Sequence, residues 1–302
     1  MITVRTPATS ANCSIGFDCL GLALDWKSEI SFEPAETLKI TGCPAKYAGE
    51  DNLVYQSFVY TCKACQVEVP GVHIHIDSDI PFARGLGSSS QCIAAGILGA
   101  DALLDLHLDD RQKLDLATQI EGHPDNVAPA LRGGLCSCIS TGNTKDGNQE
   151  ILPVDLGAHG WHVLVVIPDY EVSTKEARKV LPSSISLQDA AKQVGHALLF
   201  EYAWVHGDEN LLYEACVDVL HEPSRSKLIK DYPDLYALAR KDRIPFWISG
   251  SGPTMAFVSQ NEDLLRNLQH YLACREVLEE MDSHLKLRLC KVSDQGAEVT
   301  YG

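Results

Sequence analysis

The chain has 302 residues, 45% of them hydrophobic, and a formal net charge of −16 from 25 basic and 41 acidic side chains. This acidity argues against nucleic acid as a partner, because no basic stripe is available to neutralise a phosphate backbone. No long apolar run favours a membrane span, and the N-terminus lacks the pattern of a targeting peptide, so we expect a cytoplasmic globular protein of about two domains.

Eleven cysteines are spread along the chain. Their odd number and irregular spacing argue against a disulfide framework. Cys62 and Cys65 form one closely spaced pair, but a zinc site would need a second pair at a matching distance. We therefore expect reduced, mostly buried thiols that behave as small apolar side chains.

A polar turn at residues 7–21 is the first distinctive segment, with Pro-Ala-Thr-Ser-Ala-Asn followed by Gly-Phe-Asp. Taken alone, it could be an ordinary turn. Farther along, Val72, Ile74 and Ile76 alternate with polar residues, which predicts a half-buried strand whose polar side faces outward.

Residues 81–91, Pro-Phe-Ala-Arg-Gly-Leu-Gly-Ser-Ser-Ser-Gln, follow this strand and lead into a predicted helix over 89–106. Gly85 and Gly87 allow a tight turn. The three serines at 88–90 are expected to cap the helix and to present free N–H groups at its positive end. The segment therefore predicts a phosphate cradle.

The cradle does not match the commonest phosphate motifs. No lysine lies between Lys63 and Lys113, which excludes a Walker A loop, and the dinucleotide fingerprint lacks its third glycine. A serine-capped helix after a glycine turn remains the alternative interpretation when the segment is considered alone.

The next helix is expected to be capped by Asp109 and Asp110 and to run to Glu121, where a polar segment over 122–134 interrupts the helical region. This segment could serve turn formation alone. It also brings together a metal-binding carboxylate, an imidazole, a candidate base and an amide, at Glu121, His123, Asp125 and Asn126. Mg²⁺ prefers one or two carboxylates together with substrate phosphates, so Glu121 and a loop serine would suit it.

Two later segments complete the pattern. Ser-Thr-Lys-Glu at 173–176 is a capping-box sequence, and a helix there would place Thr174 and Arg178 on one face. Ser-Gly-Ser-Gly-Pro-Thr at 249–254 lies between two apolar runs. Together with the earlier turns, these segments indicate loops that converge on a polyanionic ligand and its acceptor.

Three of these segments, at 7–18, 81–90 and 249–254, resemble the signature motifs of the GHMP small-molecule kinases, and within that superfamily the chain is most similar to the homoserine kinases. The resemblance runs from about Val4 to beyond Pro253. It implies an α+β, two-domain fold: an ATP-binding half (1–158) similar to domain 2 of ribosomal protein S5, and a ferredoxin-like half (159–302). The resemblance also implies a possible homodimer.

For the donor ATP, the resemblance implies that the loop wraps the phosphates and that Ser89 and Glu121 hold Mg²⁺. Asn52 corresponds to a position that contacts adenine. The loop residues assigned to ATP are Pro81, Phe82, Ala83, Arg84, Gly85, Leu86, Gly87, Ser88, Ser89, Ser90 and Gln91.

For the acceptor L-homoserine, the resemblance implies that Asp18 binds the ammonium and that Arg178 and Arg225 bind the carboxylate. The other residues expected to line its site are Asn12, His123, Asn126, Thr174 and Gly250. Each has an ordinary alternative, because a surface arginine is usually solvated, Asp18 could cap a turn and His123 could brace its loop.

The implied activity is phosphorylation of the homoserine hydroxyl in threonine biosynthesis. In some GHMP kinases an aspartate paired with a lysine activates the acceptor hydroxyl. Asp125 corresponds to that aspartate, but Thr9 stands at the position of the lysine. We therefore expect positional catalysis by Asn126, with Asp125 as a lesser candidate base. Another GHMP small-molecule kinase and a non-catalytic binding protein of the same fold remain the alternatives.

Overall fold

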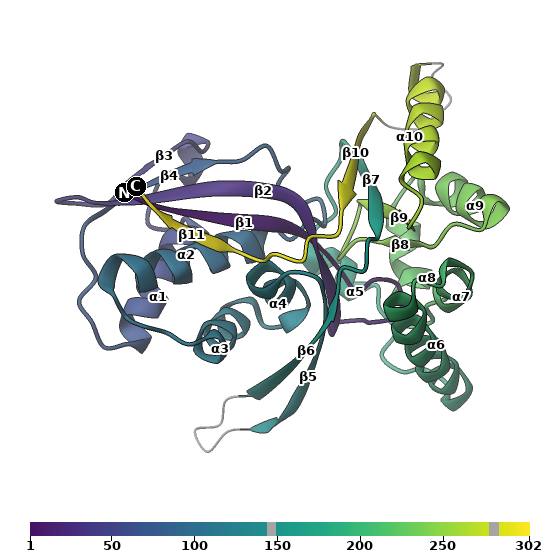
Figure 1. Ribbon diagram of the computed structural model, residues 1–302, viewed down its shortest axis with the longest axis horizontal. Helices are drawn as coiled ribbons and strands as arrows, with labels where there is room; N and C mark the ends of the chain where they lie inside the picture. The colour runs from purple at the N-terminus through teal and green to yellow at the C-terminus, as the bar shows by residue number, and fades with distance from the viewer. Residues whose placement is uncertain (144–148, 278–283) are drawn as a thin grey trace.

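Two β-sheets organise the chain, each covered by helices, as shown by the computed structural model, which describes residues 1–143, 149–277 and 284–302 (Figure 1). The first and last strands pair, so the two termini lie side by side at one end of the molecule. The predicted α+β class is therefore confirmed.

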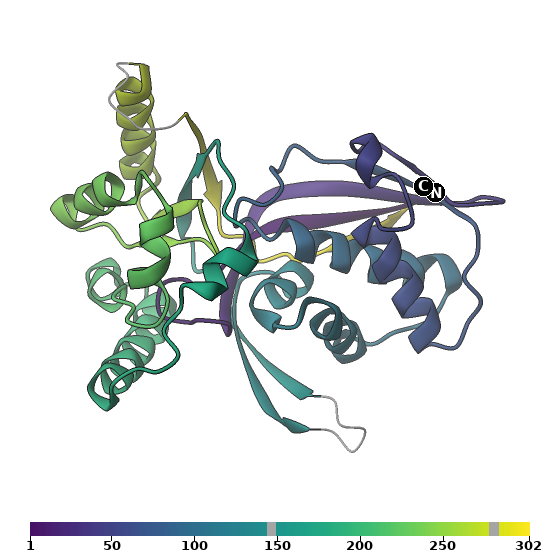
Figure 2. The same cartoon turned by 180° about the vertical axis from the view of Figure 1, so that it is seen from behind.

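The larger sheet has seven strands in the described parts of the chain, in the order β11-β1-β2-β4-β3 with β5 and β6 joined to the far end of β2. Its strands are β1 (Ile2–Ala11), β2 (Leu20–Pro34), β3 (Lys39–Thr41), β4 (Val72–Asp77), β5 (Leu135–Asn143), β6 (Gln149–Gly157) and β11 (Glu298–Tyr301). Four helices cover one face (Figure 2): α1 (Leu53–Ala64), α2 (Ser88–Leu104), α3 (Asp110–Glu121) and α4 (Pro124–Arg132). A short 3-10 turn, η1 (Ala45–Tyr47), precedes α1.

The smaller sheet is antiparallel, with the order β10-β7-β9-β8 expected of a ferredoxin-like arrangement. Its strands are β7 (His162–Pro168), β8 (Phe246–Ile248), β9 (Met255–Ser259) and β10 (Leu285–Lys291). Its helical elements are α5 (Thr174–Lys179), α6 (Leu187–His206), α7 (Glu209–Ala215), α8 (Glu222–Arg225), η2 (Ser226–Leu228), α9 (Tyr232–Asp242) and α10 (Glu262–Val277).

One hydrophobic cluster spans both sheets and holds them together. Leu22 and Leu24 from β2 belong to it, as do Trp161, Trp204 and Trp247 from the second half of the chain. These side chains are at most a few per cent exposed, and burial of large aromatic groups contributes strongly to packing. The space between the sheets is therefore a rigid place for a site.

The division at residue 158 stays a prediction. The chain does pass from β6 to β7 between Gly157 and His162, but β11 returns to the larger sheet. Residues 298–301 therefore belong to the larger sheet, where they pair with β1 and cover an edge that would otherwise be open.

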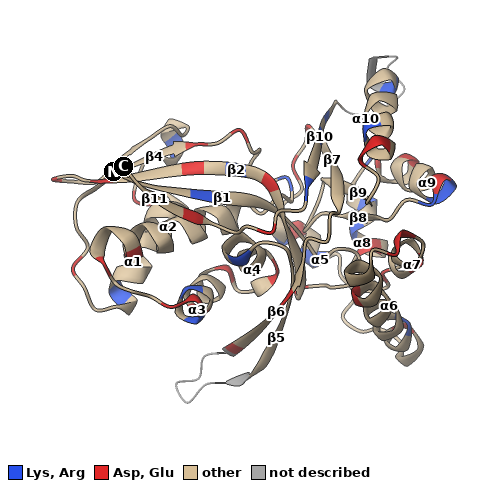
Figure 3. Ribbon diagram, in the orientation of Figure 1, with Lys and Arg blue, Asp and Glu red and all other residues tan. Residues whose placement is uncertain are grey.

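Several local predictions are confirmed. Val72, Ile74 and Ile76 are the buried side of β4, and Asp109 caps α3 in a capping box with Gln112. All eleven cysteines are free, as expected. As a separate finding, the described helices include none long and apolar enough to cross a membrane. Acidic side chains are scattered over both halves of the molecule (Figure 3).

Two local predictions are wrong. Gly87, not a serine, is the N-cap of α2, and it makes no side-chain cap hydrogen bond. The segment 122–134 is not a loop, because α4 begins at Pro124 immediately after a turn at Gly122 and His123. Proline fits the first turn of a helix, where its missing N–H has no partner to lose.

Candidate active site

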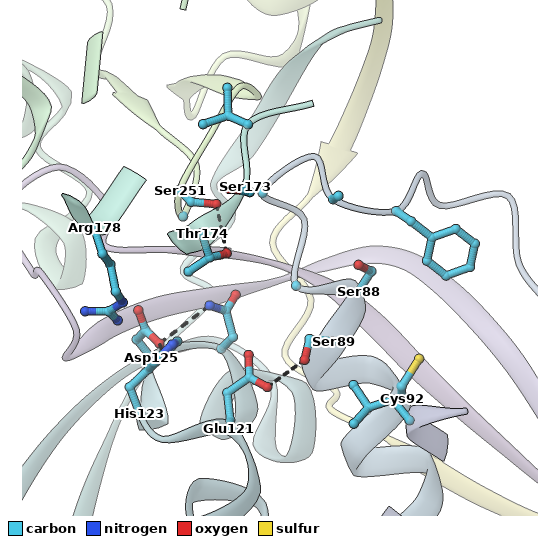
Figure 4. Close-up of a pocket in the computed structure, with 18 of the residues that line it drawn as sticks. Ser88, Ser89, Cys92, Glu121, His123, Asp125, Ser173, Thr174, Arg178 and Ser251 are labelled. Carbon is cyan, nitrogen blue, oxygen red and sulfur yellow. Dashed lines mark hydrogen bonds and ion pairs between the residues drawn. The ribbon is translucent and has the colours of Figure 1, made fainter. Parts of the chain in front are cut away.

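A cavity of about 460 Å³ lies where the two halves of the chain meet. Among the residues predicted from sequence, those that line it are Asn12, Asp18, Asn52, Phe82, Ala83, Gly85, Gly87, Ser88, Ser89, Glu121, His123, Asp125, Asn126, Thr174, Arg178, Arg225 and Gly250. The predicted acceptor residues are all in this group, although they come from segments as far apart as the turn after β1 and the turn after β8. Figure 4 shows three of them, His123, Thr174 and Arg178.

The start of α2 faces this cavity. Gly87 has a φ of +64°, and a Cβ there would lie 1.8 Å from the hydroxyl of Thr9, so only glycine fits. The first intrahelical bond runs from the N–H of Gln91 to the carbonyl of Gly87. The N–H groups of the first helical turn therefore have no intrahelical acceptor and are available to an anion.

Five of the predicted loop residues, Pro81, Arg84, Leu86, Ser90 and Gln91, lie outside the cavity lining. Leu86 is buried in the core, and Gln91 donates to the carbonyl of Leu86 and accepts from Ser28. These residues hold the shape of the loop from behind.

Arg84 does not supply the positive charge that the missing lysine would have supplied. Its guanidinium donates to the carbonyls of Pro168 (3.2 Å) and Asp169 (2.9 Å) and pairs with Glu171 at 3.2 Å. Arg84 therefore links the loop to β7 in the second half of the chain, and charge on a bound polyanion must be neutralised by other groups.

Glu121 at the end of α3 meets the start of α2. The hydroxyl of Ser89 donates to Glu121 at 2.7 Å (Figure 4). The hydroxyl of Ser90 donates to the other carboxylate oxygen at 3.3 Å. A carboxylate and a hydroxyl beside a phosphate-sized anion site are the donor set that Mg²⁺ accepts. The predicted juxtaposition of Ser89 and Glu121 is thus present.

The first turn of α4 presents Asp125 and Asn126 to the cavity. The hydroxyl of Thr9 donates to Oδ1 of Asn126 at 2.7 Å, which fixes the orientation of the amide. Asp125 is buried and its carboxylate is in close contact with Nδ1 of His123. Sequence reasoning treated Thr9 only as a missing lysine, whereas the structure gives it this positioning contact.

His123 stands beside Asp125, where sequence reasoning found no lysine to act as a partner. Burial lowers the pKa of His123, but the hydrogen bond to Asp125 and the charges of Asp125, Glu121 and Asp18 raise it, and the resulting pKa lies above the ordinary value. The contact with Asp125 therefore favours the protonated form of the imidazole.

Asp18 and Arg178 form a two-pronged ion pair across the cavity. The guanidinium donates to both carboxylate oxygens, at 2.9 and 2.7 Å. Asp18 was predicted to bind the ammonium of an amino acid, and Arg178 its carboxylate. The ion pair between them holds both charged groups at the cavity, where such a ligand would bind. Ser173 caps α5 through the N–H of Glu176, as predicted, which places Thr174 and Arg178 at the wall.

Arg225 is buried on the same side of the cavity. Its Nη1 donates to the carbonyl of Gly250 at 3.0 Å, and its guanidinium and that of Arg178 lie 5.1 and 5.6 Å from the ring of Phe17. Burial and then the neighbouring Arg178 lower the pKa of Arg225. No carboxylate in the described parts of the chain forms an ion pair with it.

Phe17 and His221 were missed by sequence reasoning, although Phe17 stands within the Gly-Phe-Asp motif. The imidazole of His221 stacks on Phe17 at 5.4 Å, and its Nε2 donates to the carbonyl of Ser14 at 2.7 Å. Burial lowers the pKa of His221, so the ring is neutral and its Nδ1 faces Nη1 of Arg225 at 3.5 Å. These contacts orient the arginine.

The turn at 249–254 supports the glycine loop. The hydroxyl of Ser249 donates to the carbonyl of Gly85 at 2.6 Å, and Nδ2 of Asn12 donates to the carbonyl of Gly250 at 2.9 Å. Ser251 lies 3.5 Å from Thr174 (Figure 4). One turn of the second half therefore contacts both motifs of the first half.

An apolar wall completes the cavity at the end away from Asp18. Tyr47, Phe82, Ile76, Cys43 and Cys92 line it, and the rings of Tyr47 and Phe82 are 6.0 Å apart. Only Phe82 was named beforehand as a site residue.

Asn52, which is the N-cap of α1, also lines the cavity. Its Oδ1 accepts from the N–H of Val54, and its Nδ2 donates to the carbonyl of Tyr47. The side chain thus has a structural partner at each end, and the predicted contact with adenine stays a prediction.

One group of possible metal ligands is found among the described residues, namely Asp18, His123 and Asp125, whose ligand atoms lie within 4.8 Å of one another. Arg178 already binds both oxygens of Asp18, and His123 binds Asp125. Because Arg178 and His123 occupy the carboxylates, the group suits an organic cation better than a metal ion.

The comparisons with known proteins agree with this geometry. The model of the GHMP kinases N terminal domain matches residues 52–134. Homoserine kinases from two clostridia are similar over most of both chains: that of Clostridium beijerinckii is 39% identical over 88% of this chain and 89% of the relative, and that of Clostridium botulinum strain 657 is 38% identical over 90% and 91%. A crystal structure of homoserine kinase from Cytophaga hutchinsonii superposes with a TM-score of 0.86 and 28% identity, covering 99% of this chain and 97% of that chain.

Proposed function

The chain belongs to the homoserine kinase family of the GHMP kinases, and on that basis we propose that it transfers the γ-phosphoryl group of ATP to the side-chain hydroxyl of L-homoserine, forming O-phospho-L-homoserine for threonine biosynthesis. The observation that carries the proposal is one cavity that joins the Ser89–Glu121 pair at the start of α2 to the charged cluster of Asp18, Arg178 and Arg225.

The donor end has the groups that ATP and Mg²⁺ need. Free N–H groups at the start of α2 would bind the phosphates, and the adjacent wall with Tyr47 and Phe82 offers aromatic faces to a base. Ser89 and Glu121 would hold Mg²⁺, which when bound neutralises phosphate charge during an in-line transfer. The loop provides no lysine, so backbone and metal carry the neutralisation.

The acceptor end has charges for both ends of an amino acid. A carboxylate offers about four lone-pair sites, so Asp18 can accept from an ammonium while it keeps its pair with Arg178. Arg225 is a buried cation without a carboxylate partner in the described chain, and a buried unpaired charge is costly. A substrate carboxylate would neutralise it, which favours an amino acid over a sugar or a neutral alcohol.

Asn126 orients the acceptor hydroxyl in this proposal. Because Thr9 holds Oδ1 of Asn126, the amide NH₂ is turned toward Asp125, to whose Oδ1 it donates at 3.5 Å, and its second hydrogen can donate to the hydroxyl oxygen. Asp125 stands beside it as a lesser candidate base, with His123 as its partner. Phosphoryl transfer depends mainly on alignment and charge stabilisation, so positioning is the main task of these side chains.

An assay of ADP release tests the proposal against its alternatives. We expect ADP with L-homoserine as acceptor, and much less with mevalonate, galactose or shikimate. Release of ADP with one of the other alcohols alone would favour another GHMP small-molecule kinase. Binding of ATP without ADP release, at any Mg²⁺ concentration and with every acceptor, would favour a non-catalytic binding protein. The cytoplasmic location expected from the sequence stays a prediction.

A further inference from the structure

The turn that carries Asp18 has an unfavourable backbone conformation. Asn12, Cys13, Ser14 and Asp18 have φ values of +66°, +42°, +65° and +58°. In a residue with a side chain, a left-handed φ brings Cβ close to the following carbonyl oxygen, so this conformation is mostly left to glycine and to single residues. Three such residues in a row persist only where surrounding groups hold the chain. The segment 12–18, which we call the strained turn, therefore needs support from outside its own sequence.

Two buried side chains from the second half of the chain hold the strained turn. Nε2 of Gln193, on α6, donates to the carbonyl of Ile15 at 2.7 Å, and Nε2 of His221 donates to the carbonyl of Ser14 at 2.7 Å. Gln193 is 8% exposed and His221 is fully buried. Two consecutive carbonyls of the turn thus depend on side-chain donors, because a buried carbonyl that loses its donor is left unsatisfied.

Asp218 joins these two side chains to each other. Its Oδ1 accepts from Nε2 of Gln193 at 2.8 Å, and its Oδ2 accepts from the backbone N–H groups of His221 and Glu222 at 2.7 and 2.8 Å. Oε1 of Gln193 accepts from the N–H of Val219 at 3.0 Å, so both N–H donors and the oxygen of this amide have partners. The amide and the carboxylate therefore fix α6, the start of α8 and the strained turn relative to one another.

The same network reaches Arg225. The carbonyl of Ser14 can only accept and a guanidinium can only donate, so His221 bears its proton on Nε2 and presents the lone pair of Nδ1 to Nη1 of Arg225 at 3.5 Å. Nη1 also donates to the carbonyl of Gly250, which accepts from Nδ2 of Asn12 in the strained turn. One buried network thus holds this cation and the turn that carries the anion, although they come from opposite halves of the chain.

We propose that Gln193, Asp218 and His221 are positioning residues of the acceptor site. This set, the clamp, holds the strained turn and Arg225 at the separation that the two charged ends of the amino acid require. The inference rests on the proposed function, because it takes Asp18 and Arg225 as groups that bind homoserine. The three clamp residues do not line the cavity, so they act through the turn and the arginine and do not touch the substrate.

Steady-state kinetics of Gln193→Met test the effect of the clamp on substrate binding. Methionine is similar to glutamine in length, so it preserves the packing of α6, but it cannot donate to Ile15 or Asp218. We expect the KM for homoserine to rise about tenfold or more and the KM for ATP to change less than about threefold. Gln269→Met on α10, which removes a hydrogen bond to the carbonyl of Leu287, is the matched control and should leave both KM values unchanged.

A purely structural role of Gln193 gives a different result. A variant that is only less stable contains less active enzyme, which lowers the apparent kcat and leaves both KM values at the wild-type level. That pattern in Gln193→Met would overturn the proposal.

Two replacements of His221 separate its hydrogen bond from its ring. His221→Phe keeps an aromatic ring beside Phe17 but cannot donate to Ser14, so the KM for homoserine should rise about tenfold. His221→Gln retains an N–H donor and should recover most of that loss. A wild-type KM for His221→Phe would contradict the proposal, as would a KM for His221→Gln as high as that of His221→Phe.

Hydrogen exchange of the free enzyme tests the clamp independently of catalysis. The N–H groups of Gly16 and Asp18 donate to the carbonyl and to Oδ1 of Asn12, at 2.8 and 3.0 Å, so they exchange only when the strained turn opens. We expect exchange about tenfold or more faster in Gln193→Met than in the wild type or in Gln269→Met. Unchanged exchange would refute the clamp. Faster exchange, in an enzyme whose wild type releases no ADP with homoserine, would refute the proposed function and leave the clamp in place.

Discussion

Replacement of Arg225 by methionine is expected to weaken the binding of homoserine selectively. Arg225 is only 2% exposed, donates to the carbonyl of Gly250 at 3.0 Å, and rests on Phe17. Burial and Arg178 lower its pKa, which reflects the cost of a second cation in a confined site. Methionine keeps much of the apolar stem and removes the charge, so the packing on Phe17 is largely preserved.

The size of the effect follows from one lost charge-assisted hydrogen bond. Such a bond contributes about 1.5–3 kcal/mol, which corresponds to a rise of roughly 10- to 150-fold in the KM for homoserine. The KM for ATP should change less than about threefold, because Arg225 lies at the acceptor end of the cavity. Steady-state kinetics with each substrate varied in turn give both values.

Arg240→Met provides the matched control. Arg240 also rests on an aromatic ring, 4.3 Å from the centroid of Tyr213, but it is exposed on α9 and does not line the cavity. This variant should bind both substrates like the wild type. Equal increases in both KM values for Arg225→Met, or an unchanged KM for homoserine in a folded variant, would show that Arg225 does not bind the substrate carboxylate.

Three further changes probe the metal, the loop and the buried acid. Glu121→Gln should raise the Mg²⁺ concentration for half-maximal activity roughly 10- to 100-fold, since one charged ligand is lost, and a Mg²⁺ titration with unchanged midpoint would contradict the assignment. Gly87→Ala should raise the KM for ATP and lower kcat, because the added Cβ displaces Thr9, which holds the amide of Asn126. Gly160→Ala is the control, because Gly160 has a similar φ of +75° but open space around it, so its replacement adds backbone strain without a steric clash. Equal activity losses in the two variants would argue against a steric effect at Gly87. Burial and the neighbouring Asp218 raise the pKa of Glu222 to about 8. The folded state therefore keeps a proton that the unfolded state releases above about pH 4.5. As the pH rises from there to about 8, the wild type should lose about 1.4 kcal/mol of unfolding free energy per pH unit relative to Glu222→Gln. Urea-unfolding free energies of the two proteins that change in parallel with pH would refute this.

Local features were predictable from the sequence because their causes are local. The alternation of Val72, Ile74 and Ile76 depends on the two-residue period of a strand, and the cap at Asp109 depends on side chains within three residues. The glycine loop was located for the same reason. Its N-cap was misassigned because a left-handed glycine can start a helix without any side-chain acceptor.

The helix α4 shows where local signals fail. The segment 122–134 has the glycines, prolines and polar residues of a loop, yet it is helical from Pro124 to Arg132. Val127 and Ala128 are buried there in a cluster with residues of α2 and α3. Tertiary burial of this apolar side outweighs the weak intrinsic propensity of the segment.

The sequence by itself determined which residue types the site contains: a phosphate-binding helix start, a carboxylate for a metal, and cations and an anion suited to an amino acid. Only the tertiary structure decided how these groups are paired. Asp18 meets Arg178 across 160 positions of the chain, His123 contacts Asp125, and Arg225 remains buried without an ion-paired carboxylate among the described residues. Such pairings depend on the core that joins the two sheets, and the distance along the chain carries no information about them.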